Sequence, residues 1–309
     1  MNISFRRSLT LLSLLFITVA AMAQQYQSLK APLTFIVAND LGRNGYYEQK
    51  PVAELMGRVA DEVSPEAVIA AGDVFHYMGV QSTNDPLWYS NFENIYTHPE
   101  LQISWLTICG NHEYRGNTSA LIEYSAVSRR WQMESRYYTQ VFESKKTSVR
   151  LIMLDTTPLI DKYRQDTDKY PDAHLQDAQA QLEWLENTLA TSTEQWIIVV
   201  GHHPIFADTD KDESERADMQ KVNHLLKKYR ADFYICGHIH NFQHLRSRDS
   251  SVDYIVNTSG SLAREVHPIA ETKFCYSAEG FSVISASRDN LTLSMINQEG
   301  NIIYKVSRK

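Results

Sequence analysis

Six short apolar runs along the chain each end abruptly at a polar cluster. Runs of four to six apolar residues without helical spacing are typical of strands that are buried on both faces. They cover residues 33–38, 67–71, 105–109, 151–154, 196–200 and 233–236. This pattern predicts six core strands.

Amphipathic segments separate these runs. The spacing of apolar residues predicts helices over about 49–62, 119–131, 174–191 and 216–229. The third is the clearest, because Leu175, Ala178, Leu182, Leu185 and Leu189 recur every three or four residues on one face. Strands that alternate with helices predict parallel pairing through right-handed crossovers.

The last part of the chain has a different pattern. Short apolar runs at 254–256, 281–286, 291–296 and 302–306 are separated by turn residues. They predict an antiparallel β meander. Together the patterns predict an α/β fold with two packed mixed β-sheets flanked by helices, in a single domain over residues 24–309.

The first 23 residues have the layout of a cleavable secretory signal. Arg6 and Arg7 precede an apolar stretch over 9–21, and a small-residue site follows at 21–23. We therefore expect a secreted or periplasmic protein. An uncleaved membrane anchor remains the alternative, although the apolar stretch is short for a membrane span.

The charge balance argues against two classes of partner. Residues 1–23 contain two arginines and no acid, so the rest of the chain carries 28 basic and 37 acidic side chains, a net charge of −9. Such a surface is unsuited to nucleic acid or to an anionic membrane as the main partner. A small anionic substrate stays possible, because bound cations would dominate the field inside a pocket.

Three cysteines are present, at positions 109, 236 and 275. Cys109 and Cys236 each close an apolar run just before a glycine, where a small buried residue fits. We expect inert core thiols; one disulfide or a metal-ligating cysteine remains an alternative.

The polar clusters that follow the core strands carry the chemistry. In an open α/β sheet, ligands bind beyond the carboxyl ends of the strands, so residues far apart in sequence can converge there. Carboxylate, amide oxygen and imidazole together suit iron, zinc or manganese. The candidate ligands are Asp40, Asp73, His76, Asn111, His202, His238 and His240.

Seven protein ligands are too many for one ion that keeps a position open for substrate. They suit two ions that share a bridging carboxylate, the arrangement used for the hydrolysis of phosphate esters. The pair His238 and His240 is the strongest single signal, since alternate residues of an extended segment face the same side.

The ordered clusters resemble those of the calcineurin-like metallophosphoesterases, and among them the small purple acid phosphatases, also called tartrate-resistant acid phosphatases. That family has the blocks D-x-G, G-D-x-x-Y, G-N-H-D/E, V-x-x-H and G-H-x-H. Here they are 40–42, 72–76, 110–113, 199–202 and 237–240. The resemblance extends over nearly the whole chain beyond residue 23 and implies an α/β/β/α sandwich.

The resemblance also implies a ligand set and a reaction. One metal takes Asp40, Asp73, His240 and the residue at His76, and the other takes Asp73, Asn111, His202 and His238. The expected cofactors are two metal ions, iron plus zinc, iron or manganese. A metal-activated hydroxide then attacks a small phosphorylated substrate, and His112 protonates the leaving oxygen. We expect a monomer.

Two positions depart from the family. The tyrosine whose ferric charge transfer gives the purple colour is replaced by His76, so we expect a working site without the colour and a preference there for a divalent ion. Tyr77, the next residue, is the alternative ligand, although on an extended segment it would face the other way. In addition, no histidine occurs between Ile205 and Asn223, which leaves Lys211, Asp208 or Asp210 to border the pocket.

Three further residues have open roles. Asp155 ends a strand run and either orients a ligating imidazole or serves as a plain helix cap or turn acid. Arg43 and Arg115 flank two clusters and either contact the phosphate of the substrate or form exposed salt bridges.

The leading functional prediction is the hydrolysis of phosphate monoesters. The alternative is a phosphodiesterase or nucleotidase of the same superfamily, but Gly42 stands where many diesterases have a histidine. A non-catalytic binder of metal or phosphate is the third possibility, and the full ligand set together with His112 disfavours it.

Overall fold

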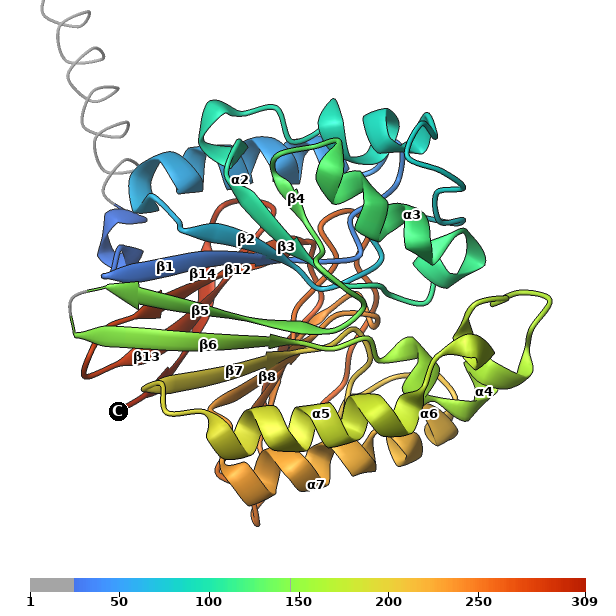
Figure 1. Cartoon of the computed structure of the whole chain (residues 1–309). Helices are drawn as coiled ribbons and strands as arrows, with labels where there is room; N and C mark the ends of the chain where they lie inside the picture. The colour runs from blue at the N-terminus through green and yellow to red at the C-terminus, as the bar shows by residue number, and fades with distance from the viewer. Residues whose placement is uncertain (1–24, 145) are drawn as a thin grey trace, which may run out of the picture.

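The computed structural model describes residues 25–144 and 146–309. Two seven-stranded mixed β-sheets pack together, and helices cover their outer faces (Figure 1). The predicted two-sheet α/β fold is therefore confirmed. The predicted secretory signal at residues 1–23 lies outside the described residues.

The first sheet combines four parallel strands with an antiparallel extension. Strands β1 to β4 are parallel neighbours, and β12 pairs antiparallel with β1 and begins the β12–β13–β14 meander. In spatial order the strands are β14 (Ile302–Arg308), β13 (Leu291–Asn297), β12 (Gly280–Ala286), β1 (Leu33–Ala38), β2 (Ala67–Ala70), β3 (Ser104–Thr107) and β4 (Trp131–Gln132).

The second sheet contains the other core strands. Its spatial order is β11 (Thr272–Tyr276), β9 (Phe242–Leu245), β10 (Asp253–Val256), β8 (Phe233–Cys236), β7 (Trp196–Val200), β6 (Thr147–Met153) and β5 (Tyr138–Ser144). The run at 254–256 was predicted to belong to the meander, and this is wrong. It forms β10, which pairs parallel with β8 in the second sheet.

The longer helices lie outside the sheets. α2 (Gln49–Val63) covers the first sheet, and α5 (Ala178–Thr191) and α7 (Gln220–Tyr229) cover the second (Figure 1). Shorter helices are α3 (Thr118–Glu123), α4 (Asp161–Gln165) and α6 (Glu213–Asp218). Single helical turns occupy Gln27–Leu29, Tyr89–Glu93, Pro99–Leu101, Glu113–Arg115, Tyr124–Ala126, Thr157–Leu159 and Ala173–Leu175. No helix among the described residues has the length and apolar character needed to cross a membrane.

Three helix predictions need correction. The helix predicted over 119–131 ends at Glu123, because the chain turns so that the Trp131 indole donates to the Leu121 carbonyl (2.8 Å). The helix predicted from 174 begins only at Ala178, where the carboxylate of Asp177 caps it, and Leu175 is 67 % exposed. The helix predicted over 216–229 is two helices that meet at Met219.

The core joins the two sheets. Phe35 of β1 meets Phe142 of β5 edge to face, with 4.9 Å between the ring centroids. Cys109 and Cys236 are buried and free, as expected of core thiols, and Cys275 is free and partly buried. The three cysteines thus form no disulfide in the part of the chain that the structure describes.

Candidate metal centre

The seven predicted ligands meet at one edge of the two sheets. They lie in the loops that follow β1, β2, β3, β7 and β8, and every one of them is buried. Backbone hydrogen bonds connect the loops: the N–H of Asp40 donates to the carbonyl of Gly72 (3.0 Å) and that of Leu41 to Asp73 (2.9 Å). Residues spread over two hundred positions therefore form one cluster.

The Asp73 carboxylate stands at the centre of this cluster. Its Oδ2 lies 3.2 Å from Nε2 of His202, 3.4 Å from Nε2 of His76 and 3.9 Å from Nε2 of His112. Burial opposes the charged form of Asp73, but the nearby His202 and His112 hold its pKa well below the usual range. The carboxylate is thus ionised and faces several imidazoles at once.

Asp40 contributes a second carboxylate to the cluster. Oδ1 of Asp40 lies 3.1 Å from Nε2 of His240. Ligand atoms of Asp40, His76 and His240 all lie within 4.8 Å of one another, as do those of Asp40, Asp73 and His202. The two carboxylates therefore belong to adjoining groups that can hold cations.

Unusual backbone conformations place four of the predicted ligands. Asp40, Asp73, His238 and His240 have φ values of 51°, 52°, 72° and 65°. Non-glycine residues in this left-handed region cost free energy, and such residues persist where the surroundings over-determine them. All four lie in the loops that follow β1, β2 and β8.

Glycines allow the loops to approach one another closely. A Cβ on Gly110 would lie 2.3 Å from Oδ1 of Asp73, and one on Gly72 would lie 2.6 Å from Nδ1 of His202. Gly72 also has a φ of +88°. The glycines that precede Asp73 and Asn111 are therefore required by the packing of the ligands themselves.

Backbone carbonyls fix the orientation of two imidazoles. Nδ1 of His202 lies 2.9 Å from the carbonyl oxygen of Ala71, and Nδ1 of His240 lies 2.9 Å from that of Leu262. A proton on each Nδ1 leaves the Nε2 lone pair free to bind a metal, the tautomer that such contacts select at metal sites. Both Nε2 atoms face the carboxylates.

Glu113 holds the loops beneath the ligands. Its carboxylate accepts hydrogen bonds from the N–H groups of Asp73 (2.9 Å), Gly110 (2.6 Å) and Phe75 (3.1 Å). Burial and then the charge of Asp73 raise the pKa of Glu113 to about 8. This residue ties the loop after β2 to the loop after β3.

Several buried polar atoms of the cluster have no hydrogen-bond partner among the residues that the structure describes. They are Oδ1 of Asp40, both ring nitrogens of His76, Oδ1 of Asn111 and Nε2 of His202. Buried polar groups are almost always satisfied, so a group of such atoms in one place needs an explanation. Oxygen and imidazole donors aimed at a shared space fit bound divalent or trivalent cations.

His238 has a partner that the sequence did not reveal. Its Nε2 lies 3.0 Å from Oε2 of Glu215, which is buried in α6 and also accepts from the hydroxyl of Tyr163 (2.9 Å) and pairs with Lys162. Only Nδ1 of His238 is therefore open to a cation. Burial alone would raise the pKa of Glu215, but the hydrogen bond and charge of His238 lower it.

His203 is a second residue that sequence reasoning missed. Its ring and those of His202 and His238 offer nitrogens within 4.8 Å of one another. Nδ1 of His203 contacts Oγ1 of Thr156 (2.8 Å), and its buried Nε2 has no hydrogen-bond partner within residues 25–144 and 146–309. The histidine doublet at 202–203 was the only signal for it.

The imidazole-orienting role offered for Asp155 is not what the structure shows. Its side chain accepts from the hydroxyl of Tyr114, and its backbone groups bond to Gln181. Burial raises the pKa of Asp155 to about 7. The buried hydrogen bond to Tyr114 supports the structural alternative for this residue.

Two candidates from the 205–215 loop differ in their surroundings. Burial, and then the charge of Arg264, lower the pKa of Lys211. The charges of Asp73 and Asp40 act in the opposite direction and raise it. Asp208 instead accepts from the N–H of His267 (2.6 Å). The pKa of Lys211 thus responds to the carboxylates of the cluster.

His112 is the most accessible imidazole beside Asp73. Its Nδ1 contacts the carbonyl oxygen of Tyr77 (2.9 Å), and its ring lies 4.2 Å from that of His76. The side chain is 15 % exposed, while those of His76 and His202 are closed to solvent. Burial lowers the pKa of His112 to about 3.

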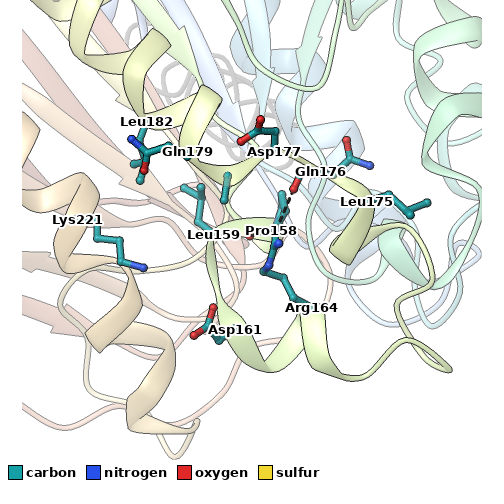
Figure 2. Close-up of a pocket in the computed structure, with 11 residues that line it drawn as sticks. Pro158, Leu159, Asp161, Arg164, Leu175, Gln176, Asp177, Gln179, Leu182 and Lys221 are labelled. Carbon is teal, nitrogen blue, oxygen red and sulfur yellow. Dashed lines mark hydrogen bonds between the residues drawn. The ribbon is translucent and has the colours of Figure 1, made fainter.

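A separate cavity of about 540 Å³ lies on the outer helical layer. Figure 2 shows it between the turn at Pro158 and Leu159 and side chains of α4, α5 and α7, with Arg164 bonded to the carbonyl of Gln176 (2.9 Å). None of the predicted ligands lines this cavity. It is therefore no extension of the metal centre.

Sequence comparisons agree with this geometry. Residues 33–242 match the model of the calcineurin-like phosphoesterases. The chain is 31 % identical over 269 residues to tartrate-resistant acid phosphatase type 5 of Oryctolagus cuniculus, and the alignment covers 82 % of each chain. It is 30 % identical over 294 residues to purple acid phosphatase 17 of Arabidopsis thaliana, and this alignment covers 88 % of this chain and 83 % of the relative.

Solved structures share the fold. GAP50, the anchor in the inner membrane complex of Plasmodium, superposes with a TM-score of 0.76 at 22 % identity and covers 89 % of this chain and 87 % of its own. The purple acid phosphatase PPD1 of yellow lupin superposes with a TM-score of 0.61 at 16 % identity and covers 89 % of this chain and 53 % of its own. Both likenesses support the two-sheet architecture.

Proposed function

Because the chain belongs to the calcineurin-like phosphoesterase family, we propose that it hydrolyses phosphate monoesters with two bound metal ions. The observation that carries this proposal is the position of Asp73. Its buried carboxylate adjoins two groups of ligand atoms and can bridge two cations. Matched relatives are named acid phosphatases, which supports the reaction class.

The ligands divide into two sets around Asp73. Asp40, His76 and His240 would hold one ion with it, and Asn111, His202 and His238 would hold the other. The close approach of Asp40, His76 and His240 supports the first set. The free Oδ1 of Asn111 and the free Nε2 of His202 support the second. Iron with zinc, iron or manganese suits these donors.

The proposed reaction needs Lewis acidity from the metals and a proton donor for the leaving oxygen. When bound, two such cations supply Lewis acidity toward a phosphate oxygen and lower the pKa of a water molecule. His112 is placed to hydrogen-bond the leaving oxygen, because it is the imidazole beside Asp73 that solvent reaches. Asp73 and an anionic phosphate next to the ring would both favour its protonated form.

Monoesters are favoured over diesters by the geometry at Gly42. A Cβ at this position would lie 2.2 Å from the carbonyl oxygen of Val74, so no side chain fits there. A histidine of the kind that many diesterases carry would force the loop apart. Hydrolysis of p-nitrophenyl phosphate should therefore exceed that of bis(p-nitrophenyl) phosphate in kcat/KM. Faster turnover of the diester would establish the phosphodiesterase alternative.

The histidine at position 76 should leave the iron-loaded protein without a purple colour. We expect no strong visible band from wild-type protein, because an imidazole gives no tyrosinate charge transfer. His76→Tyr should gain such a band, and His76→Phe should not. A strong band in the wild-type protein would show that a tyrosine ligates, with the neighbouring Tyr77 as the first candidate.

The proposal extends to where the protein is located and to its oligomeric state. A secreted or periplasmic monomer accords with the apolar segment at 9–21 and with the acidic balance of the remaining chain. The expected partner is a small phosphorylated molecule, since the centre is buried beneath loops.

A further inference from the structure

A cavity of about 490 Å³ opens directly beside the metal centre. We call it the tyrosine pocket; its lining residues are Arg43, Asn44, Tyr46, Tyr47, His76 and Tyr77. Tyr46, Tyr47 and Tyr77 are 73 %, 60 % and 64 % exposed. Exposed aromatic side chains gathered around a cavity are typical of a ligand-binding site.

Arg43 lines this pocket and has no ionic partner in the described part of the chain. The residue is only 6 % exposed, and its Nε and Nη1 are buried with no hydrogen-bond acceptor among the described residues. Its guanidinium lies 5.1 Å from the centroid of the Tyr77 ring. The exposed salt bridge considered for Arg43 is therefore not what the structure shows. A buried cation that lacks acceptors is costly, and an anionic ligand would satisfy it.

The loop that carries Arg43 is held in place. The side-chain oxygen of Gln49 accepts from the N–H groups of Arg43 (3.0 Å) and Gly45 (2.8 Å), and that of Asn91 accepts from Asn44 (2.8 Å). A pocket whose walls are fixed before binding loses little conformational entropy when a ligand enters.

The pocket adjoins His112, the proposed proton donor to the leaving oxygen. The ring of Tyr77 lies 6.3 Å from that of His112 and 6.4 Å from that of His76. A phosphate held beside Asp73 with His112 at its leaving oxygen would thus direct its organic group toward the three tyrosines.

We propose that the tyrosine pocket binds the leaving group, and that the preferred substrates are aryl phosphates that carry a second anionic group. This inference rests on the proposed phosphomonoesterase function. The tyrosines stack on the aromatic ring. Arg43 pairs with the added carboxylate or phosphate.

Three substrates test the proposal with the metal-loaded protein: 4-carboxyphenyl phosphate, phenyl phosphate and glycerol phosphate. Arg43→Gln should lower kcat/KM for the carboxylated ester by about 10- to 100-fold relative to phenyl phosphate. Tyr46→Ala should lower kcat/KM for both aryl esters by about 3- to 10-fold and leave glycerol phosphate unchanged. Tyr276→Ala, an exposed tyrosine of β11, is the matched control and should change none of them.

Equal losses for all three substrates in Arg43→Gln would overturn the proposal, because Arg43 would then hold the transferred phosphate. Unchanged rates in both pocket variants would overturn it as well. Binding of 4-carboxybenzylphosphonate, measured by calorimetry, gives a readout that needs no hydrolysis. Arg43-dependent binding by a protein that cleaves no ester would support the pocket while refuting the proposed function. Binding equal in wild type and Arg43→Gln would refute the pocket.

Discussion

Replacing Asp73 by Asn should abolish the two-metal site. The side chain is buried, its carboxylate lies near His76, His112 and His202, and it is the one ligand that both proposed metal sets share. An amide has the same shape but no charge to hold two cations together. We expect fewer than two metals per chain and a fall in kcat of at least about 10³-fold, since bound cations supply several kcal/mol of transition-state stabilisation.

A matched control separates this effect from a general loss of acidic charge. Asp208→Asn alters an aspartate of the adjoining 205–215 loop. Among the described residues, Asp208 hydrogen-bonds to His267 and Gln243 and to none of the proposed ligands. It should retain its metal and most of its activity. Circular dichroism on both variants checks the fold. An Asp73→Asn protein that keeps two metals and wild-type turnover would remove Asp73 from the centre.

His112→Ala should slow turnover while the metals stay bound. General acid catalysis by a positioned side chain contributes roughly 10² to 10⁴ in rate. The loss should be larger for glycerol phosphate than for p-nitrophenyl phosphate, because p-nitrophenolate is a stable anion that departs without a proton. Steady-state kinetics on both esters, with metal content measured on the same sample, checks the result.

The dependence on leaving group distinguishes two roles for His112. Equal losses on the two esters would mean that the ring only hydrogen-bonds the phosphate. Unchanged rates would exclude any role in the reaction. His174→Ala, an exposed histidine on a helical turn, serves as the matched control and should behave as wild type.

One physical reason explains why the core strands, and the convergence of the polar residues that follow them, can be predicted from the sequence. Buried strands must be apolar, so the first polar residue after each run marks its end, and parallel strands end at a common edge. Asp40, Asp73, Asn111 and His202 could be found in this way. The placement of 254–256 could not, because local pattern does not tell which of two sheets a short buried strand joins.

The role of Glu215 could not be predicted from the sequence pattern. The residue stands in a segment at 210–216 in which every residue but Ser214 is charged, as in a solvated helix, yet the fold buries it against His238. The half-buried strands β5 and β11 went unpredicted because neither is a continuous apolar run. β5 pairs with the adjacent β6, and β11 pairs with β9, so their strand structure depends on these partners rather than on their own apolar pattern. The tyrosine pocket likewise joins residues 43–47 to 76–77 only through the fold.

The metal content of wild-type protein tests the central claim most directly. Elemental analysis should be made on protein purified without chelator, with p-nitrophenyl phosphate turnover measured on the same sample. We predict about two metal ions per chain together with hydrolysis. One metal or none, with no hydrolysis at any pH after addition of iron, zinc or manganese, would contradict a dinuclear phosphatase.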